Sequence, residues 1–438
     1  MKAEFRTIGQ LASEKRENKS VPVFGGCWLH YNGPGSSGFG VKRTAMLLPE
    51  SAMLMVGPMG CSRSGTVVAE KYGFAHRMFY LNLDDRSISL GTYLKRIPEA
   101  VQYIKDLGQF KAVLICMTCL DALLGTDLAG LGRKISAQVG IPVTTTFMDP
   151  IVRDGNYGPM VQVRQAITNC FESPENGSGC KADDTLNLLG TFAPIEKESE
   201  LFTLLKGAGI KEIKTAAGCS TFEELQKMGS SRANLIVHPQ AAACGADLEK
   251  RLGMPYIKLY TSYVPDKIEE NYNKLGAFLK ADICCGKEKR EAGEKIKEFA
   301  MKYKGRKIAV GEAVCGNPFD IALMLIGAGI DVPFVFRDMI HPEDWNLIDA
   351  LNMRAPDLKV YSGVHPTTAA CPSSLPEADL MLGLDAGYYN QKAISAAWPF
   401  DRTYYGFDGI KALLEIMDTA FSNPKGHREQ MKGTYLTV

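Results

Sequence analysis

The sequence lacks several features that would assign it to a simple class. Its 438 residues contain no apolar run near the roughly 18 residues of a membrane span, and its opening stretch, MKAEFRTIGQLASEKRENKS, is polar where a signal peptide is apolar. Lys and Arg number 50 against 49 Asp and Glu, so the net charge near +1 creates no field that attracts nucleic acid or an anionic membrane. We therefore expect a cytoplasmic protein with neither nucleic acid nor membrane as a partner.

Two familiar motifs for nucleotide and metal binding are also missing. The chain has no G-x-x-x-x-G-K-(S/T) phosphate-binding loop, so we do not expect it to hydrolyse nucleotide itself. Its 12 cysteines include no pair with zinc-finger spacing. Because cellular reductants keep cytosolic thiols reduced, structural disulfides are not expected. The cysteines therefore favour metal binding or redox chemistry, with inert buried thiols as the alternative.

Short apolar runs alternate with amphipathic stretches of helical length, as in parallel sheets whose strands are joined by helical crossovers. The predicted strands are 51–57, 78–83, 111–117, 141–148, 185–192, 211–216, 233–237, 256–260, 307–311, 332–336, 358–362 and 378–382. The predicted fold class is α/β, with three Rossmann-like domains, each a mostly parallel sheet flanked by helices. Polar, glycine-bearing segments at 172–184 and 284–307 suggest domains at 1–175, 176–300 and 301–438.

Three cysteines in the first part of the chain stand at turns or strand ends. Cys61 (GPMGCSRSG) and Cys119 (CMTCLDALLGTD) each follow a predicted strand. Because ligands gather at the carboxyl ends of strands in open α/β sheets, both thiols belong to the functional edge of one sheet. Cys27 lies in the glycine-rich segment GGCWLHYNGPG, whose backbone can approach a bulky inorganic group. Thiolates dispersed in this way suit an iron–sulfur cluster, and scattered buried thiols are the alternative.

Five segments together resemble component 1 of the nitrogenase superfamily: GGCWLHYNGPGSSGFG, GPMGCSRSG, TCLDALLGTDL, NLIVHPQAAACGADLEKRLGMPY and TYYGFDG. This superfamily includes nitrogenase MoFe-protein subunits, cofactor-assembly scaffolds, dark-operative protochlorophyllide reductases, the reductive cyclase of nickel-tetrapyrrole synthesis and methylthio-alkane reductase. The resemblance covers most of the chain. It implies three α/β domains and an iron–sulfur cluster at a subunit interface, ligated by Cys27, Cys61 and Cys119.

Cys116 competes with Cys119 for the third ligand position. In the family pattern the ligand cysteine is followed six residues later by a glycine and then by an acidic residue, and Cys119, Gly125 and Asp127 fit that frame. Cys116 is then predicted to be a strand thiol that points into the sheet. We therefore assign Cys119 as the third ligand.

The resemblance also implies cofactors and partners. Three cysteines leave a four-iron cluster (4Fe–4S) one ligand short. Either a partner subunit supplies the fourth ligand, or two chains, identical or homologous, together hold an eight-iron cluster like the nitrogenase P-cluster. The working form is then a dimer or tetramer, handled under anaerobic conditions. In the family, electrons come from a separate iron–sulfur reductase that hydrolyses ATP and docks over the interfacial cluster.

The segments that correspond to the cofactor-binding site of nitrogenase differ from those of nitrogenase itself. The MoFe α-subunit holds its large cofactor by a cysteine before the middle-domain helix and a histidine before the GFDG segment. Here the first region offers His238, followed by Cys244, and residues 398–409 contain no histidine. A central cavity is therefore expected to hold an organic substrate or a second, differently ligated metallocluster. His238, at the family's ligand position, and His365, after a strand, are candidate catalytic residues; a structural histidine bonded to backbone is the alternative for each.

These features predict the catalytic component of a nitrogenase-like, two-component reductase. Electrons would enter from the ATP-dependent reductase and pass through the cluster to a bound substrate. The candidate substrates are a tetrapyrrole double bond, a carbon–sulfur bond of a thioether, and dinitrogen. One alternative is a scaffold on which a nitrogenase-type metallocluster is assembled. The other is a simple α/β binding protein with buried cysteines.

Overall fold

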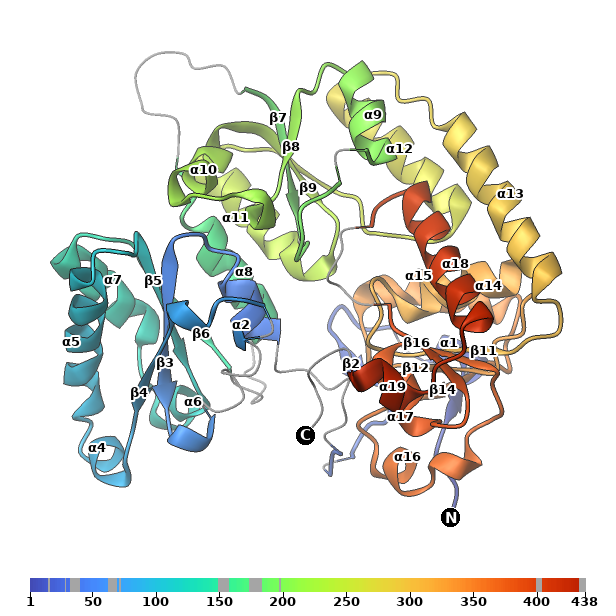
Figure 1. The fold of residues 1–438 in the computed structure, drawn as a ribbon, viewed down its shortest axis with the longest axis horizontal. Coiled ribbons are helices and arrows are strands. Elements are labelled where there is room, and N and C mark those ends of the chain that lie inside the picture. The colour runs from blue at the N-terminus through green and yellow to red at the C-terminus, as the bar shows by residue number, and fades with distance from the viewer. Residues whose placement is uncertain are drawn as a thin grey trace. The chain divides into compact units, whose positions relative to one another are not determined.

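The computed structural model divides the chain into two compact units (Figure 1). It describes residues 1–14, 16–27, 29–31, 40–61, 69–70, 72–148, 157–172, 183–196, 198–398 and 404–432. The unit that we call the N-terminal unit comprises residues 37–195 and 209–259, and the C-terminal unit comprises residues 1–36, 196–208 and 260–438. Within the described ranges, no helix is long and apolar enough to span a membrane.

The first sheet of the N-terminal unit is fully parallel. Its strands, in spatial order, are β4 (Met78–Asn82), β3 (Ser51–Gly57), β5 (Ala112–Met117) and β6 (Val143–Phe147). Its helices are α2 (Gly40–Ala45), α4 (Asp85–Ser89), α5 (Tyr93–Asp106), α6 (Leu120–Leu124), α7 (Leu128–Val139) and α8 (Pro159–Thr168). Helices α5 and α7 cover one face and α2 and α8 the other, so the central strands β3 and β5 are buried throughout and read as continuous apolar runs.

The winding of this sheet reverses between β3 and β5. The chain runs from β3 to β4 on one side, whereas β5 lies on the other side of β3 and leads to β6. Open α/β sheets bind ligands at the carboxyl ends of strands beside such a reversal. The two strand ends meet closely, because a Cβ added at Gly57 would lie 2.5 Å from Cγ2 of Thr118. Glycine is therefore the residue that fits at the end of β3.

The second sheet of the N-terminal unit repeats this topology. Its parallel strands are β10 (Tyr256–Lys258), β9 (Ser231–Ile236), β7 (Asp183–Leu189) and β8 (Glu212–Lys214), with helices α10 (Phe222–Gln226) and α11 (Ala242–Leu252). The reversal lies between β7 and β9. There Gly190 has φ of +118°, and a Cβ on it would lie 2.7 Å from Cβ of His238. The residue that follows β9 thus packs directly on the end of β7.

The C-terminal unit is built on one larger sheet. Its order is β1 (Arg6–Thr7), β14 (Lys359–Tyr361), β12 (Phe334–Phe336), β11 (Ile308–Val310), β15 (Leu380–Leu382) and β16 (Ile394–Ala396), parallel except for β1. A separate antiparallel pair joins β2 (Val21–Pro22) to β13 (Met339–Ile340). The described helices of this unit are α1 (Ile8–Ala12), α9 (Glu200–Gly207), α12 (Pro265–Leu279), α13 (Gly286–Lys302), α14 (Pro318–Gly327), α15 (Trp345–Asn352), α16 (Pro366–Ala370), α17 (Leu384–Tyr389), α18 (Phe407–Ser422) and α19 (His427–Lys432). The three parallel sheets confirm the predicted α/β class.

The N-terminal segment differs from the sequence-based expectation. The sequence predicts residues 1–36 as the beginning of an N-terminal domain, whereas β1 pairs with β14 of the C-terminal sheet and the segment belongs to the C-terminal unit. The reason is that β1 and β2 are two residues long and carry no periodic pattern that would indicate a partner. The domain boundaries near 175 and 300 stay predictions.

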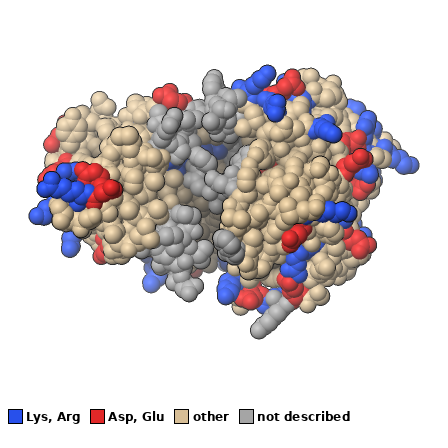
Figure 2. All heavy atoms as spheres, turned by 90° about the horizontal axis from the view of Figure 1, so that it is seen from below, with Lys and Arg blue, Asp and Glu red and all other residues tan. Residues whose placement is uncertain are grey.

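Charged side chains of both signs are mixed on the surface. On the face drawn in Figure 2, the described Lys and Arg side chains lie among Asp and Glu side chains instead of gathering in one area. Exposed ion pairs such as Lys227 with Glu223 and Lys274 with Glu270 belong to this pattern. Pairs of this kind contribute little stability each, so the surface charge supports solubility more than folding.

The GFDG segment joins two helices by reciprocal capping. The buried carboxylate of Glu200, in the first turn of α9, accepts hydrogen bonds from the backbone N–H of Phe407 (2.6 Å) and Asp408 (3.0 Å) at the start of α18. In return, the Asp408 carboxylate accepts a bond from the backbone N–H of Glu200 (2.7 Å). Each carboxylate therefore satisfies open donors at the N-terminus of the other helix. Tyr272 completes the arrangement by donating its hydroxyl to Glu200 (2.7 Å).

We predict that Gly406→Ala destabilises the C-terminal unit. Gly406 has φ of +73°, and a Cβ there would lie 2.1 Å from Oε1 of Glu200 and 2.4 Å from the Tyr272 hydroxyl. The free energy of unfolding, measured by urea denaturation, should fall by about 2–4 kcal/mol. Gly409→Ala is the matched control, because a Cβ there meets nothing closer than 3.5 Å. Equal stability of the two variants would contradict this role for Gly406.

The same carboxylate predicts a pH dependence. Burial raises the pKa of Glu200 to about 7 from 4.5, although the bonds from Tyr272 and Phe407 oppose the shift. The folded protein thus holds this proton more tightly than the unfolded chain, so the stabilisation is complete below pH 4.5 and is lost as the pH rises through 7. Urea titrations across this window should show the wild type losing on the order of 3 kcal/mol more than Glu200→Gln. Parallel pH profiles of the two proteins would refute the assignment.

Candidate functional site

Two of the three predicted cluster ligands lie beside the reversal of the first sheet. Cys61 lies in a helical turn after β3, where its backbone N–H donates to the carbonyl of Pro58 (3.0 Å), and its side chain is exposed. Cys119 follows β5 at the start of α6 and is half-buried. Since β3 and β5 are neighbouring parallel strands, both thiols stand at the same edge of the sheet. This is the ligand-binding edge of an open α/β sheet.

Large apolar side chains next to these cysteines face solvent. Met59 is 70% exposed, and Leu123 is 68% exposed. They belong to the two segments that carry Cys61 and Cys119, namely the turn after β3 and α6. Exposed apolar groups gathered at a polar or reactive site are typical of a surface that another protein covers. The carboxyl edge of the first sheet thus carries the thiols of Cys61 and Cys119 together with an apolar rim formed by Met59 and Leu123.

Cys116 has the environment of a core residue. It lies in β5 opposite Met55 and Thr146, is fully buried, and packs in the apolar layer beneath α2 and α8. Burial raises the pKa of its thiol to about 12, so it stays protonated at neutral pH. Thiolates rather than thiols ligate iron. This agrees with the prediction that Cys116 is a strand thiol and leaves Cys119 as the accessible cysteine of the pair.

A buried amine lies near this edge. Lys42 of α2 has no exposed surface, and burial lowers its pKa, while the charges of Cys116 and Cys61 act in the opposite direction. The amine therefore sits within electrostatic reach of both thiols.

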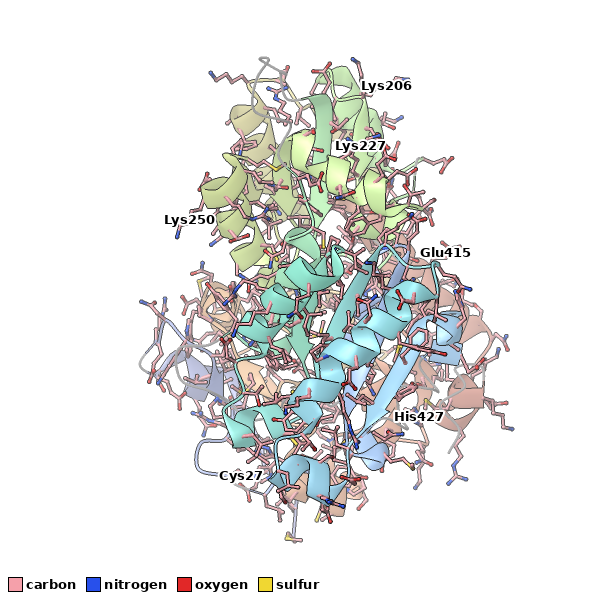
Figure 3. All side chains as sticks on the ribbon, turned by 90° about the vertical axis from the view of Figure 1, so that its left-hand side faces the viewer. Cys27, Lys206, Lys227, Lys250, Glu415 and His427 are labelled. Carbon is pink, nitrogen blue, oxygen red and sulfur yellow. The ribbon has the colours of Figure 1, made fainter. Side chains whose placement is uncertain are left out.

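Cys27 belongs to the C-terminal unit (Figure 3), and the residues described around it, 23–27 and 29–31, are in neither helix nor strand. The loop is tied to the C-terminal sheet by backbone bonds from Val23 to Asp338 (3.0 Å) and from Tyr31 to Val364 (2.7 Å). The half-buried thiol of Cys27 donates to the carbonyl of Leu29 (3.2 Å). The three predicted ligands are thus divided between the two units. Among the described residues, no group of three or more His, Cys, Asp and Glu side chains is gathered for metal binding, so the joint ligation by Cys27, Cys61 and Cys119 stays a prediction.

His238 lies at the reversal of the second sheet, two residues after the end of β9. Its Nδ1 accepts a hydrogen bond from the backbone N–H of Gln240 (3.2 Å), which caps the short helical turn Pro239–Ala241. Cys244 follows on α11 and is buried, whereas Lys250 of the same helix points outward (Figure 3). Burial raises the pKa of the Cys244 thiol to about 11. The position of His238 fits a ligand-binding role, and its capping bond fits the structural alternative.

His365 caps a helix in the C-terminal unit. Its Nδ1 lies 2.8 Å from the hydroxyl of Thr367 and accepts from the backbone N–H of the same residue (3.4 Å) at the start of α16. Its ring packs on Phe24 with centroids 4.7 Å apart. It follows β14, which does not flank the reversal of this sheet. These contacts favour the structural alternative for His365, and its catalytic role stays an untested prediction.

The sequence reasoning missed a buried ionic cluster at the carboxyl edge of the C-terminal sheet. Arg337, after β12, donates to Glu312 after β11 (2.8 Å) and to Asp344 (2.7 Å). Across the reversal, Asp385 after β15 accepts from the backbone N–H of Glu312 (2.6 Å). Burial raises the pKa of Glu312 to about 7 and that of Asp385 to about 6. Charged residues one to three positions after three buried strands were the available signal.

The segment that lacks the family histidine is described only in part. Residues 399–403 lie outside the described ranges. Trp398 is fully buried, and its Nε1 donates to the hydroxyl of Tyr263 (2.9 Å) and the carbonyl of Cys315 (3.0 Å). After the gap, Tyr405 is buried in front of Gly406. In the described part of the segment, Trp398 and Tyr405 are therefore buried aromatic side chains.

The chain belongs to the nitrogenase component 1 type oxidoreductase family, whose model matches residues 36–422. This confirms the resemblance read from the five segments. Members of the family bind iron–sulfur clusters and form oligomers that work with a reductase partner. The type of cluster and the particular partners of this chain are not decided by the family match.

Individual relatives include assembly proteins and a nitrogenase subunit. The nitrogenase iron-molybdenum cofactor biosynthesis protein NifE of Sinorhizobium fredii is 23% identical over 79% of this chain and 72% of its own length. The NifE of Mesorhizobium japonicum is 20% identical over 95% of this chain and 86% of its own. The nitrogenase molybdenum-iron protein alpha chain of Methanococcus maripaludis is 22% identical over 47% of this chain and 43% of its own.

A solved structure has the same fold. Nitrogenase Cp1 at pH 6.5 superimposes with a TM-score of 0.68 over 90% of this chain and 93% of that protein, at 18% sequence identity. At this identity the match shows the fold and nothing more specific.

We predict that Cys119→Ala lowers the iron content of the anaerobically purified protein far more than Cys116→Ala does. Cys119 is accessible at the sheet edge, whereas Cys116 is buried in the core. Iron and sulfide analysis together with the visible absorption spectrum would measure the loss. Cys116→Ala should keep its iron and lose about 1–2 kcal/mol of stability, because it leaves a small cavity. The reverse pattern of iron loss would show that Cys116 is the ligand.

Proposed function

We propose that this chain is a subunit of a scaffold that assembles a metallocluster of the nitrogenase type. The observation that carries the proposal is the contrast between two regions of the chain. The edge with Cys61 and Cys119 offers thiol ligands for an iron–sulfur cluster. The stretch that carries the cofactor cysteine in the MoFe α-subunit offers His238 here, and residues 398–409 contain no histidine to match its second ligand.

A scaffold must release what it builds. Fewer thiolate and imidazole ligands give a weaker hold on a metallocluster, which favours transfer to another protein over permanent retention. The NifE proteins of Sinorhizobium fredii and Mesorhizobium japonicum are named for cofactor biosynthesis, and they match 79% and 95% of this chain. Both considerations support the scaffold over the reductase.

The residues at the first sheet edge fit an iron–sulfur cluster at a subunit interface. Cys61 is exposed and Cys119 half-buried, so both thiols are accessible to a metal ion. Together with Cys27 they would supply three ligands, and the partner subunit would supply the rest. Met59 and Leu123 would be covered by that subunit. The bound cluster would accept and donate single electrons at low potential.

The second candidate is the reductase. The family model describes oxidoreductases, which favours electron transfer to a bound substrate. In that case an ATP-hydrolysing iron–sulfur protein would dock on this chain or its oligomer, and a tetrapyrrole or thioether would bind near His238. The same cysteines would hold the cluster in both functions.

The test distinguishes transfer of a metallocluster to another protein from catalytic reduction of a substrate. The protein, purified anaerobically with its partner subunit, should carry iron and sulfide, and should pass metallocluster to a nitrogenase component 1 that lacks its cofactor, measured by the activity the acceptor gains. Cys119→Ala is the matched control and should transfer little. Repeated reduction of a tetrapyrrole or thioether, in the presence of ATP and a cognate electron-donating reductase, would show that this chain is the catalytic component of a reductase and not a scaffold. Absence of iron and sulfide from the purified protein would exclude both functions and favour the simple α/β binding protein.

A further inference from the structure

The N-terminal unit contains a buried arginine with an open hydrogen-bonding edge. Arg164 lies on α8 and is 5% exposed. Its Nε and Nη2 have no hydrogen-bond partner among the residues that the structure describes. A desolvated guanidinium without a partner is strongly unfavourable, so buried charges in proteins are normally paired.

The two open atoms share one edge of the guanidinium. The N–H groups on Nε and Nη2 point in parallel, and this is the edge that binds two oxygens of one carboxylate or phosphate. An arginine that merely lost contact with water would have no reason to leave this particular pair open. The geometry of the open edge matches an oxyanion.

The neighbours of Arg164 do not neutralise it. Its guanidinium lies over the ring of Phe192, 4.9 Å from the centroid. Among the described residues, the titratable side chain that acts on it is Cys244. Burial lowers the pKa of Arg164 to about 10 and raises that of Cys244 to about 11. At neutral pH the arginine is therefore charged, and the cysteine is a neutral thiol.

A second positive group lies on the same ring. The guanidinium of Arg43, from α2, is 4.8 Å from the Phe192 centroid and is half-buried. Arg43 therefore adds a second guanidinium group at the same ring. Arg43 is the more exposed of the two and marks the side of the site nearer to solvent.

In contrast to Arg164, Arg251 has hydrogen-bond partners for its guanidinium group. Arg251, on α11, donates to the carbonyls of Thr168 (2.7 Å) and Phe171 (3.2 Å) at the end of α8 and pairs with Asp247 (3.3 Å). It therefore closes the C-terminus of the helix that carries Arg164. The protein supplies partners for one arginine and leaves the edge of the other open.

We propose that Arg164 and Arg43 form an oxyanion-binding site within the N-terminal unit, where two oxygens of a carboxylate or phosphate group occupy the Nε and Nη2 edge of Arg164. The site uses none of the predicted cluster ligands and does not depend on the proposed function. Its ligand is an organic acid, a phosphate ester or the free inorganic ion.

The test measures thermal stability of the full-length protein in chloride buffer at constant ionic strength, with and without added phosphate or acetate. Phosphate or acetate should raise the melting temperature of the wild type by a few degrees in a saturable manner. Comparing the two probes distinguishes a phosphate group from a carboxylate. Arg164→Met should weaken the apparent affinity at least about tenfold, because two charge-assisted hydrogen bonds are lost.

The variants also differ in the absence of the probe. Arg164→Met should be at least as stable as the wild type in chloride alone, since it removes an unpaired buried charge. Arg251→Met is the matched control: it should lower the melting temperature and keep the response to the anion. Arg164→Lys retains the charge without the two parallel N–H groups and should respond more weakly than the wild type.

Three results would overturn the site. The first is a wild-type melting temperature that neither phosphate nor acetate changes. The second is an anion response that persists in Arg164→Met. The third is a loss of stability by Arg164→Met in chloride alone, which would mean that the guanidinium is already paired within the protein. Crystals soaked in selenate offer an independent measurement, in which an anomalous peak at Arg164 supports the site and a peak only elsewhere contradicts it.

Discussion

The architecture depends on close packing between neighbouring strand ends at the reversal of each parallel sheet. A glycine at or just after the end of β3, β7 and β11 makes room for a residue that lies one to three positions beyond the neighbouring strand across the reversal. Gly57 meets Thr118, Gly190 meets His238 and Gly311 meets Asp385, and a Cβ on any of these glycines would lie between 2.3 and 2.7 Å from its neighbour. Side chains larger than hydrogen are excluded at these points, so the strand ends stay in register. The edges of the sheets thereby become fixed platforms for the residues that follow.

This packing determines which cysteines are available. Residues within β5 are buried between two layers of helices, so Cys116 is a core thiol, whereas Cys119 stands beyond the strand at its carboxyl end. The same logic places Cys61 beside it after β3. The apolar rim at Met59 and Leu123 then gives the edge the character of an interface. The accessible thiols and the exposed apolar side chains therefore belong to the same edge of this sheet.

Much of the fold follows from patterns in the chain. Each of the twelve predicted strands is present, shifted by at most a few residues, because parallel strands covered on both faces are continuous apolar runs that punctuate the sequence clearly. Four described strands, β1, β2, β13 and β16, were not predicted. They are two or three residues long and show no period of their own, and the pairing of β1 with β14 joins segments more than 350 residues apart. Such long-range contacts depend on tertiary packing that no local pattern encodes.

The sequence by itself determined the chemistry that the chain can offer: the spacing of Cys119, Gly125 and Asp127, the glycine-rich turns around Cys27 and Cys61, and the absence of a histidine in 398–409. The tertiary structure decided which of these groups are accessible and which polar groups are left open. Glu200 and Asp408 lie far apart in the chain yet cap each other's helices, and Arg164 looks like any helical arginine until its burial and its unpaired edge are seen. The reason is that burial and hydrogen-bond satisfaction are properties of the packed chain, while residue type and spacing are properties of the sequence.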